Sequence, residues 1–87
     1  MDELPVDVRD TLCQVLAEAR RTDDSETALA LLDTARRVSA NKLADGDRRA
    51  RLLHGCERAT VAFEEGEPAR ARAYVTAMER RVCEDGD

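Results

Sequence analysis

The sequence predicts an all-α protein, a single small antiparallel bundle of four helices. In four segments, apolar residues recur at intervals of three and four positions, the period of an amphipathic helix, and no segment alternates apolar and polar residues as a strand would. Short stretches rich in Asp, Gly and Pro separate these segments. We expect one domain over residues 1–87, with short frayed termini and helices at about 5–22, 25–42, 47–65 and 68–83.

The first two helices have clear start signals and apolar faces. Pro5 suits the first turn of a helix because its φ angle is fixed, and Asp24 or Ser25 is the expected N-cap of the second helix. Leu29 lies at the edge of the second apolar face, where it could make an additional contact. The faces consist of Val8, Leu12, Val15, Leu16 and Ala19 in the first helix, and Ala28, Leu31, Leu32, Ala35 and Val38 in the second.

The last two helices are separated by the strongest break in the sequence, "EEGEPARAR". Gly66 suits the left-handed position after a helix, and Pro68 suits the first turn of the next. Asp47, after the turn "ADGD", is expected to cap the third helix. Because the connections are short, sequential helices should be antiparallel. The buried faces are Leu52, Cys56, Ala59 and Phe63, and then Ala71, Val75, Met78 and Val82.

Composition and charge narrow the classes of function. The net charge is −5, and an acidic balance argues against a protein that binds phosphate-rich partners. The basic residues are thirteen Arg and one Lys, and Ile is absent, a composition that fits an acidic protein from a GC-rich genome and a salt-rich cytoplasm. No stretch approaches the roughly 18 apolar residues that cross a membrane, and the N-terminus does not resemble a signal peptide. A cytoplasmic location without membrane contact is expected.

The three cysteines predict neither a disulfide framework nor a metal motif, because their number is odd and their spacing shows no pairs. A reducing compartment is consistent with free thiols. A zinc site assembled from Cys13, Cys56, Cys83 and His54 is disfavoured, since these residues are scattered over three helices.

The stretch "RRARLLHGCERAT" contains the single histidine of the chain beside a cysteine. Residues two apart on a helix point about 200° apart, so a buried Cys56 leaves His54 exposed. The two side chains therefore cannot share a metal or form a nucleophile–base pair. Gly55, between them, is expected to let a neighbouring helix come close. We predict no catalytic, cofactor-binding or metal-binding residue, no small-molecule substrate and no enzymatic activity.

Protein–protein interaction or self-association is the function that the sequence favours. Fourteen alanines and two aromatic residues make a thin core, and a small domain gains stability from a second subunit, so a homodimer or an unknown protein partner is expected. The predicted contact surface comprises Leu29, His54, Arg58 and Val61, because Arg58 and Val61 stand at helical spacing from the exposed His54.

The alternative is a nucleic-acid-binding accessory protein that uses clustered arginines. Four adjacent pairs recur along the chain: Arg20–Arg21, Arg36–Arg37, Arg48–Arg49 and Arg80–Arg81. Acids at helical spacing indicate that these pairs belong to solvated, salt-bridged faces. Nucleic-acid binding is the less favoured function, because only Tyr74 and Phe63 could stack on bases, and Phe63 lies on the core face.

Two resemblances support a helical protein. In "ATVAFEEGEPARARAYVTAMERR", the order Phe63, Gly66–Glu67, Ala71, Tyr74 is similar to the helical hairpin of a tetratricopeptide-type repeat. The spacing from Phe63 to Ala71 is one residue short, and there is no second copy at a period of ~34 residues, so no repeat array is expected. The whole chain, including "LLHGCERA" and "AMERRV", resembles small helical proteins of halophilic archaea that carry a domain-of-unknown-function label. This resemblance implies a cytoplasmic helical bundle and no active-site residue.

Overall fold

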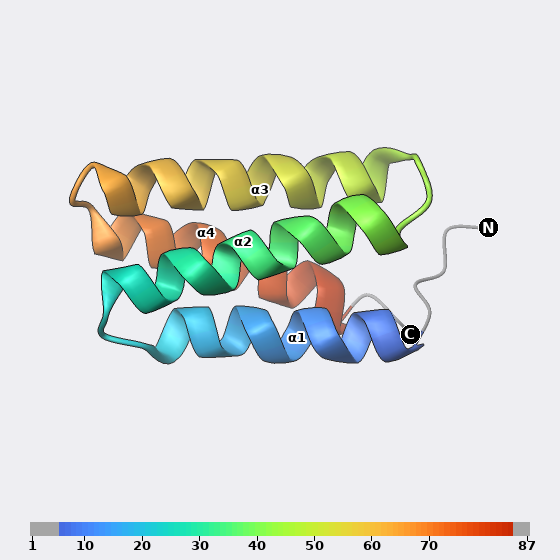
Figure 1. Ribbon diagram of the computed structural model, residues 1–87, viewed down its shortest axis with the longest axis horizontal. Helices are drawn as coiled ribbons and strands as arrows, with labels where there is room; N and C mark the ends of the chain where they lie inside the picture. Colours follow the sequence, from blue (N-terminus) through green and yellow to red (C-terminus); the bar gives the residue numbers. More distant parts are fainter. Residues whose placement is uncertain (1–5, 85–87) are drawn as a thin grey trace.

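The computed structural model describes residues 6–84 as four helices joined by short connections (Figure 1). Their bounds agree with the predicted ranges to within one residue wherever both can be compared, so the predicted fold class is confirmed. The proposed helix start at Pro5 lies outside the described residues. The helices are α1 Val6–Arg21, α2 Ser25–Lys42, α3 Asp47–Glu64 and α4 Pro68–Glu84.

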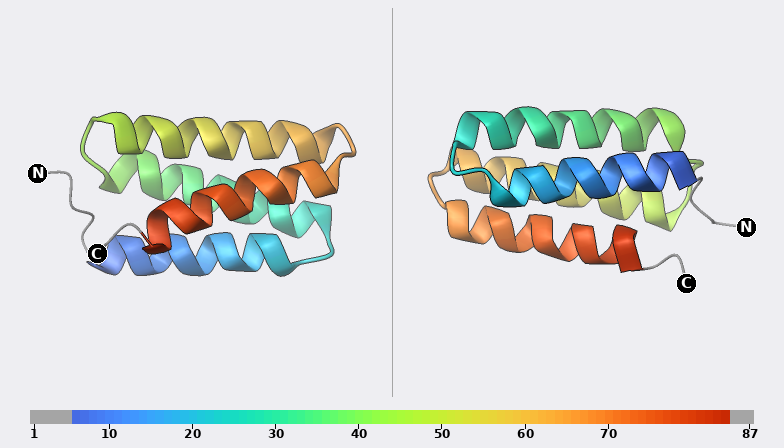
Figure 2. Two further views of the ribbon diagram at one scale, coloured as in Figure 1. Left: turned by 180° about the vertical axis from the view of Figure 1, so that it is seen from behind. Right: turned by 90° about the horizontal axis from the view of Figure 1, so that it is seen from below.

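The helices form a closed ring of antiparallel neighbours. Each consecutive pair packs together, and α4 returns to pack against α1. Viewed from behind, α4 is inclined: it begins beside the end of α3 and ends beside the first half of α1 (Figure 2). The last turn of α4 therefore lies farther from α3 than its first turn does. None of the described helices is long and apolar enough to cross a membrane.

The core consists mainly of small side chains, which lets the helices approach closely. All the predicted face residues of α3 and α4 are buried. Val8, Val15, Leu31 and Val38, predicted for the first two helices, lie half-buried at the edge of this core. The buried hydrophobic residues are Leu12, Leu16, Ala19, Ala28, Leu32, Ala35, Leu52, Cys56, Ala59, Ala62, Phe63, Ala71, Val75, Met78 and Val82.

Capping explains where two of the helices begin. Asp24 is the N-cap of α2, as predicted: its Oδ2 accepts hydrogen bonds from the Thr27 backbone N (3.2 Å) and the Thr27 hydroxyl (2.6 Å). The predicted cap at Asp47 is wrong. Gly46 occupies the N-cap position with φ 154°, and Asp47 is the first residue of α3. Its carboxylate still lies at the positive end of the helix dipole.

Lowering the pH should weaken the α2 cap. The hydroxyl and backbone hydrogen bonds from Thr27 lower the pKa of Asp24. Because the folded-state pKa is below the unfolded value, this stabilisation is present above about pH 4 and is lost as the pH falls through the folded pKa. Asn also caps helices but does not titrate. The Asp24→Asn variant should therefore keep its melting temperature at pH 7 and lose less of it between pH 5 and pH 3, measured by circular dichroism. An equally steep loss in both proteins would contradict this role.

The connection from α3 to α4 follows the predicted pattern. Gly66 has φ 77°, the left-handed conformation that glycine adopts without a steric penalty. The backbone N of Glu65 donates to Val61 O at 2.9 Å, and that of Glu67 donates to Ala62 O at 2.9 Å, so these bonds satisfy carbonyls at the end of α3.

A disulfide joins Cys13 of α1 to Cys83 in the last turn of α4, with their Cα atoms 5.7 Å apart. The prediction that the cysteines form no disulfide is therefore wrong. The two residues are separated by 70 positions in the sequence, and only the return of α4 to α1 brings them together. Cys56 is free and buried, which confirms its predicted packing in the core.

Candidate functional site

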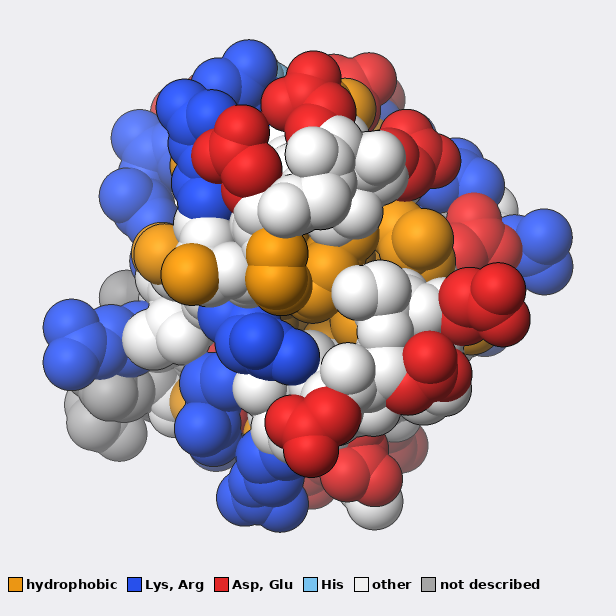
Figure 3. Space-filling model, turned by 90° about the vertical axis from the view of Figure 1, so that its left-hand side faces the viewer, with side chains coloured by type: hydrophobic (Ala, Val, Ile, Leu, Met, Phe, Trp, Pro, Cys, Tyr) orange, Lys and Arg blue, Asp and Glu red, His pale blue; other side chains and the backbone are white. Residues whose placement is uncertain are grey.

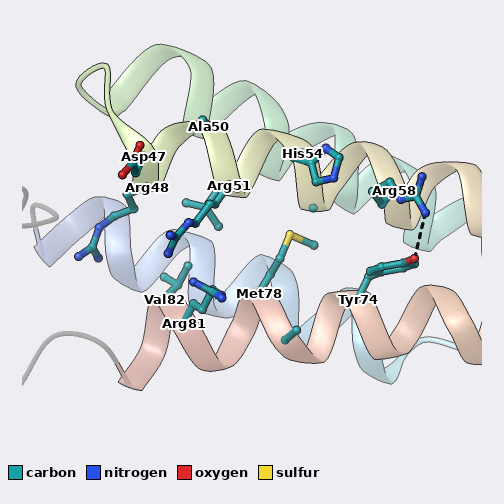
Figure 4. Close-up of a pocket in the computed structure, with 13 residues that line it drawn as sticks. Asp47, Arg48, Ala50, Arg51, His54, Arg58, Tyr74, Met78, Arg81 and Val82 are labelled. Atoms are coloured by element: carbon teal, nitrogen blue, oxygen red, sulfur yellow. Dashed lines mark hydrogen bonds between the residues drawn. The ribbon is translucent and has the colours of Figure 1, made fainter.

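An open groove of about 870 Å³ runs between α3 and α4, on the side where the two helices diverge (Figure 4). Its walls are one face of each helix, and the space between them is exposed to solvent. The residues that line it are Asp47, Arg48, Ala50, Arg51, Leu52, His54, Gly55 and Arg58 from α3, and Tyr74, Ala77, Met78, Arg81 and Val82 from α4.

The floor of the groove is apolar and close-packed. Leu52, Met78 and Val82 are each less than 5% exposed. Gly55 lies opposite Met78: a Cβ atom built on this glycine would be 2.5 Å from the Met78 sulfur. The absence of a side chain at Gly55 therefore allows Met78 to fill the space between the helices. The predicted close approach of another helix to this glycine is confirmed.

The rim of the groove is basic. Arg48, Arg51 and Arg58 from α3 and Arg81 from α4 contribute four positive charges, whereas Asp47 is the single acidic residue in the lining. This is a local excess of positive charge on a chain with a net charge of −5. Seen from the end with the α1–α2 and α3–α4 connections, basic side chains gather mostly on one flank and acidic ones mostly on the other (Figure 3).

Arg51 and Arg81 form the most accessible cationic pair of the rim. Both are exposed, and they extend toward one another from opposite walls above Val82 (Figure 4). No ion pair joins either guanidinium to a carboxylate within residues 6–83, the range over which side chains are described. Two guanidiniums that converge from separate helices are well placed to share a bound anion.

Arg58 and Tyr74 close the other end of the groove. Arg58 Nη2 donates to the Tyr74 hydroxyl at 3.4 Å, and its guanidinium carbon lies 5.8 Å from the centre of the ring. This hydrogen bond and the positive charge of Arg58 lower the pKa of Tyr74. The pair links α3 to α4 across the groove, and it places an aromatic ring beside a cation.

The structure brings together only half of the predicted contact surface. His54 and Arg58 are exposed and line the groove. Val61 is 42% exposed on α3 but lies outside the groove lining, and Leu29 on α2 is partly buried against the core. Arg51, Tyr74, Met78 and Arg81 also belong to this surface, although they were not among the predicted contact residues. One signal could have identified three of them: Arg51 and Arg58, like Tyr74 and Arg81, are seven residues apart beside a buried face.

The arginine pairs do not form one basic surface. Arg36 and Arg37 bind Asp33 at 2.8 and 3.1 Å, and Arg49 binds Asp45 at 2.9 Å. Arg20 binds Glu79 at 2.6 Å, joining α1 to α4. Of the eight positions in the four arginine pairs, Arg48 and Arg81 line the groove.

The described part of the chain contains no candidate metal-binding site. Among the side chains described, those of residues 6–83, no group of three or more His, Cys, Asp or Glu residues could hold a metal ion. Of the residues once considered for zinc, Cys13 and Cys83 bond to each other, Cys56 is buried and His54 points into the groove.

Comparison with known proteins places the chain in a family. The model of the family described as Domain of unknown function (DUF8101) matches residues 1–84. No curated protein and no solved structure matches the chain. Because the match covers almost the whole sequence and all four helices, we conclude that the chain belongs to the DUF8101 family, a domain of unknown function.

Proposed function

We propose that the protein is a non-enzymatic interaction module whose α3–α4 groove binds an acidic amphipathic helix of a partner protein. The observation that supports this function is the combination of an apolar floor and a basic rim on an otherwise acidic chain. An apolar helix face would bury surface against Ala50, Tyr74 and Ala77, the more exposed uncharged side chains of the groove, above the packed Leu52, Met78 and Val82. Carboxylates along its flank would pair with the arginines and set its orientation.

The dimensions of the groove suit a fifth helix. Ala50 and Ala77 have small, exposed side chains that leave room for close approach, whereas the space beside Gly55 is filled by Met78. Arg51 and Arg58 are two helical turns apart, about 10 Å along α3. Acidic residues spaced by seven positions in a partner helix would match this separation.

A second copy of the chain fits this groove poorly. A two-fold symmetric dimer through the groove would place Arg51 and Arg81 close to the same residues of the other copy, and like charges would repel. The predicted homodimer would need another surface. The exposed large apolar residues, Val6 and Val61, lie at opposite ends of the bundle, so they do not form one patch. Self-association through Leu29 or Val61 stays a prediction.

Nucleic-acid binding is the second candidate function. It is supported by Tyr74, whose ring lies in the groove among arginines and could stack on a base. Against it, Arg58 already occupies the ring face, and the chain as a whole is acidic. The two functions differ in salt dependence, because phosphate binding weakens steeply as salt rises.

The salt-rich cytoplasm of a halophilic archaeon is the setting we propose. At about 1 M salt, charges are screened beyond roughly 3 Å, so only close ion pairs and apolar contacts would contribute. Apolar contacts with Ala50, Tyr74 and Ala77 would then supply much of the affinity, and the arginines would supply selectivity.

The test uses two designed helical peptides with the same leucine face. One has glutamates and the other has lysines on both sides of that face. The third ligand is a single-stranded DNA oligonucleotide. Each is titrated into the ¹⁵N-labelled protein, and amide shifts are followed by NMR. We expect the acidic peptide to shift amides in residues 47–58 and 74–82, and the basic peptide to shift none. Saturable binding by the oligonucleotide alone would instead identify the second candidate function.

Charge reversal in the groove should abolish most of this affinity. The Arg51→Glu, Arg81→Glu double variant should bind the acidic peptide at least about tenfold more weakly, because both guanidiniums that face the ligand are replaced by like charges. The matched control is Arg21→Glu, Arg80→Glu, which changes the net charge equally at exposed positions outside the groove lining. An equal loss of affinity in both variants would overturn the proposed site.

A further inference from the structure

The Cys13–Cys83 disulfide lies at the surface of the bundle, beside a second cavity. This cavity, about 550 Å³, is on the α1–α4 side, and both half-cystines line it together with Asp10, Glu18 and Glu79. Both cysteines are only partly buried. A small thiol can therefore reach the bond without unfolding of the helices.

The disulfide fixes the end of α4 that contributes to the groove. Cys83 directly follows Arg81 and Val82, which line the groove on its α4 side. The bond holds this last turn against α1, and the inclination of α4 keeps it away from α3 (Figure 2). The wide end of the groove thus depends on where the disulfide places α4.

We propose that Cys13–Cys83 is a redox-modification site at which reduction by a dithiol releases the last turn of α4 and weakens ligand binding in the α3–α4 groove. The regulatory part of this inference rests on the proposed function. The oxidised protein is the binding form, because its Arg81 and Val82 are held in place. The reduced protein keeps the bundle but frays at the end of α4.

The exchange is a two-electron reaction. A thiolate of the dithiol attacks one sulfur of the disulfide, forms a mixed disulfide and displaces the other cysteine as a thiolate, which takes up a proton. The second thiol of the reductant loses its proton and closes the reductant's own disulfide, releasing the first cysteine. The dithiol is oxidised, and Cys13 and Cys83 are reduced to two thiols.

The third cysteine does not compete in this reaction. Cys56 is 1% exposed, and burial raises the pKa of its thiol to about 11. Its thiolate is therefore scarce at neutral pH, and thiolate is the reactive form. Exchange is confined to the α1–α4 pair, and reoxidation restores the same bond.

Release is confined to the end of α4 because other contacts hold the rest of the helix. Arg20 binds Glu79 at 2.6 Å, about one turn before Cys83. Arg72 Nη2 donates to the carbonyl of Thr22 at 2.9 Å near the other end of the same seam. A terminal helical turn without such a tie frays readily.

The first measurement tests the site independently of any ligand. Alkylation of the denatured protein followed by mass spectrometry should find one free thiol before dithiothreitol treatment and three afterwards. Hydrogen exchange of the amides of residues 80–84 should accelerate at least about tenfold on reduction and should then be faster than exchange of the α2 amides, which report the global loss of stability. Three free thiols without reductant, or equal exchange of residues 80–84 in the two states, would overturn the inference.

The second measurement tests the coupling to the groove. The acidic peptide is titrated into the oxidised protein, the reduced protein and the Cys13→Ser, Cys83→Ser variant, with circular dichroism confirming the fold. We expect binding about fivefold or more weaker in the last two. Equal affinity in all three would overturn the regulatory coupling. Absence of binding in every form, with the exchange difference intact, would instead overturn the proposed function and leave the redox site supported.

Discussion

Reduction of the Cys13–Cys83 disulfide is expected to lower the free energy of unfolding by about 2–4 kcal/mol. For a chain of this size, that loss corresponds to a fall in melting temperature of roughly 10–30 °C. The effect is large because the bond joins α1 to the last turn of α4 across 70 positions and so restricts nearly the whole unfolded chain. Thermal unfolding followed by circular dichroism, with and without dithiothreitol, measures it.

Two variants distinguish the effect of the disulfide on the melting temperature from the effect of the free thiol of Cys56. The Cys13→Ser, Cys83→Ser variant should melt at the temperature of the reduced protein and should not respond to reductant. The Cys56→Ala variant removes a buried sulfur but keeps the bond, so its melting temperature should still fall when dithiothreitol is added. A wild-type protein that melts at one temperature in both conditions would contradict this account.

Helix positions could be predicted closely from the sequence because local signals specify them. The connection at Gly66 and Pro68 has backbone requirements that those two residues meet, and its bounds follow directly. The buried faces of α3 and α4 follow from intervals of three and four residues. Asp47 was the exception: Gly46 and Asp47 are both acceptable at the start of a helix, and the choice between them depends on the backbone of the turn.

The disulfide and the groove could not be predicted, because both depend on how helices are arranged around the bundle. Periodicity identifies which face of α4 is buried, but it does not specify that α4 inclines from α3 toward α1. That inclination brings Cys83 to Cys13 and separates Arg81 from α3. The exposure of His54 could be predicted from the geometry of α3 alone. The groove beside it could not, because its other wall belongs to α4.

Truncation of Met78 should be the most damaging single change at the groove. Met78 is 4% exposed and fills the space between α3 and α4, so Met78→Ala should lower the free energy of unfolding by about 2–5 kcal/mol through lost contacts and the cavity left behind. Urea denaturation with the disulfide intact measures this loss, and the remaining bond keeps the variant folded. Groove binding should also weaken, because the floor loses its central side chain.

A substitution at Gly55 tests whether the contribution of Met78 to stability depends on its contact with this glycine. In a helix interior, replacing Gly by Ala normally adds about 1 kcal/mol of stability. In the wild-type protein the new Cβ would lie 2.5 Å from the Met78 sulfur and 2.8 Å from its Cγ, so the Met78 side chain must move and most of the gain should be cancelled. In the Met78→Ala background those atoms are absent, and Gly55→Ala should then give its full stabilisation.

The double-mutant cycle isolates the coupling between these two residues. We expect an interaction free energy of about 1 kcal/mol or more, with Gly55→Ala more favourable when Met78 is truncated. Ala77→Gly in the same backgrounds is the control, because Ala77 is an exposed groove residue on α4 that lies beside Met78 in the sequence. If Gly55→Ala were equally stabilising in both backgrounds, the close approach of α3 to α4 at this glycine would not be what positions Met78, and the floor of the groove would need another explanation.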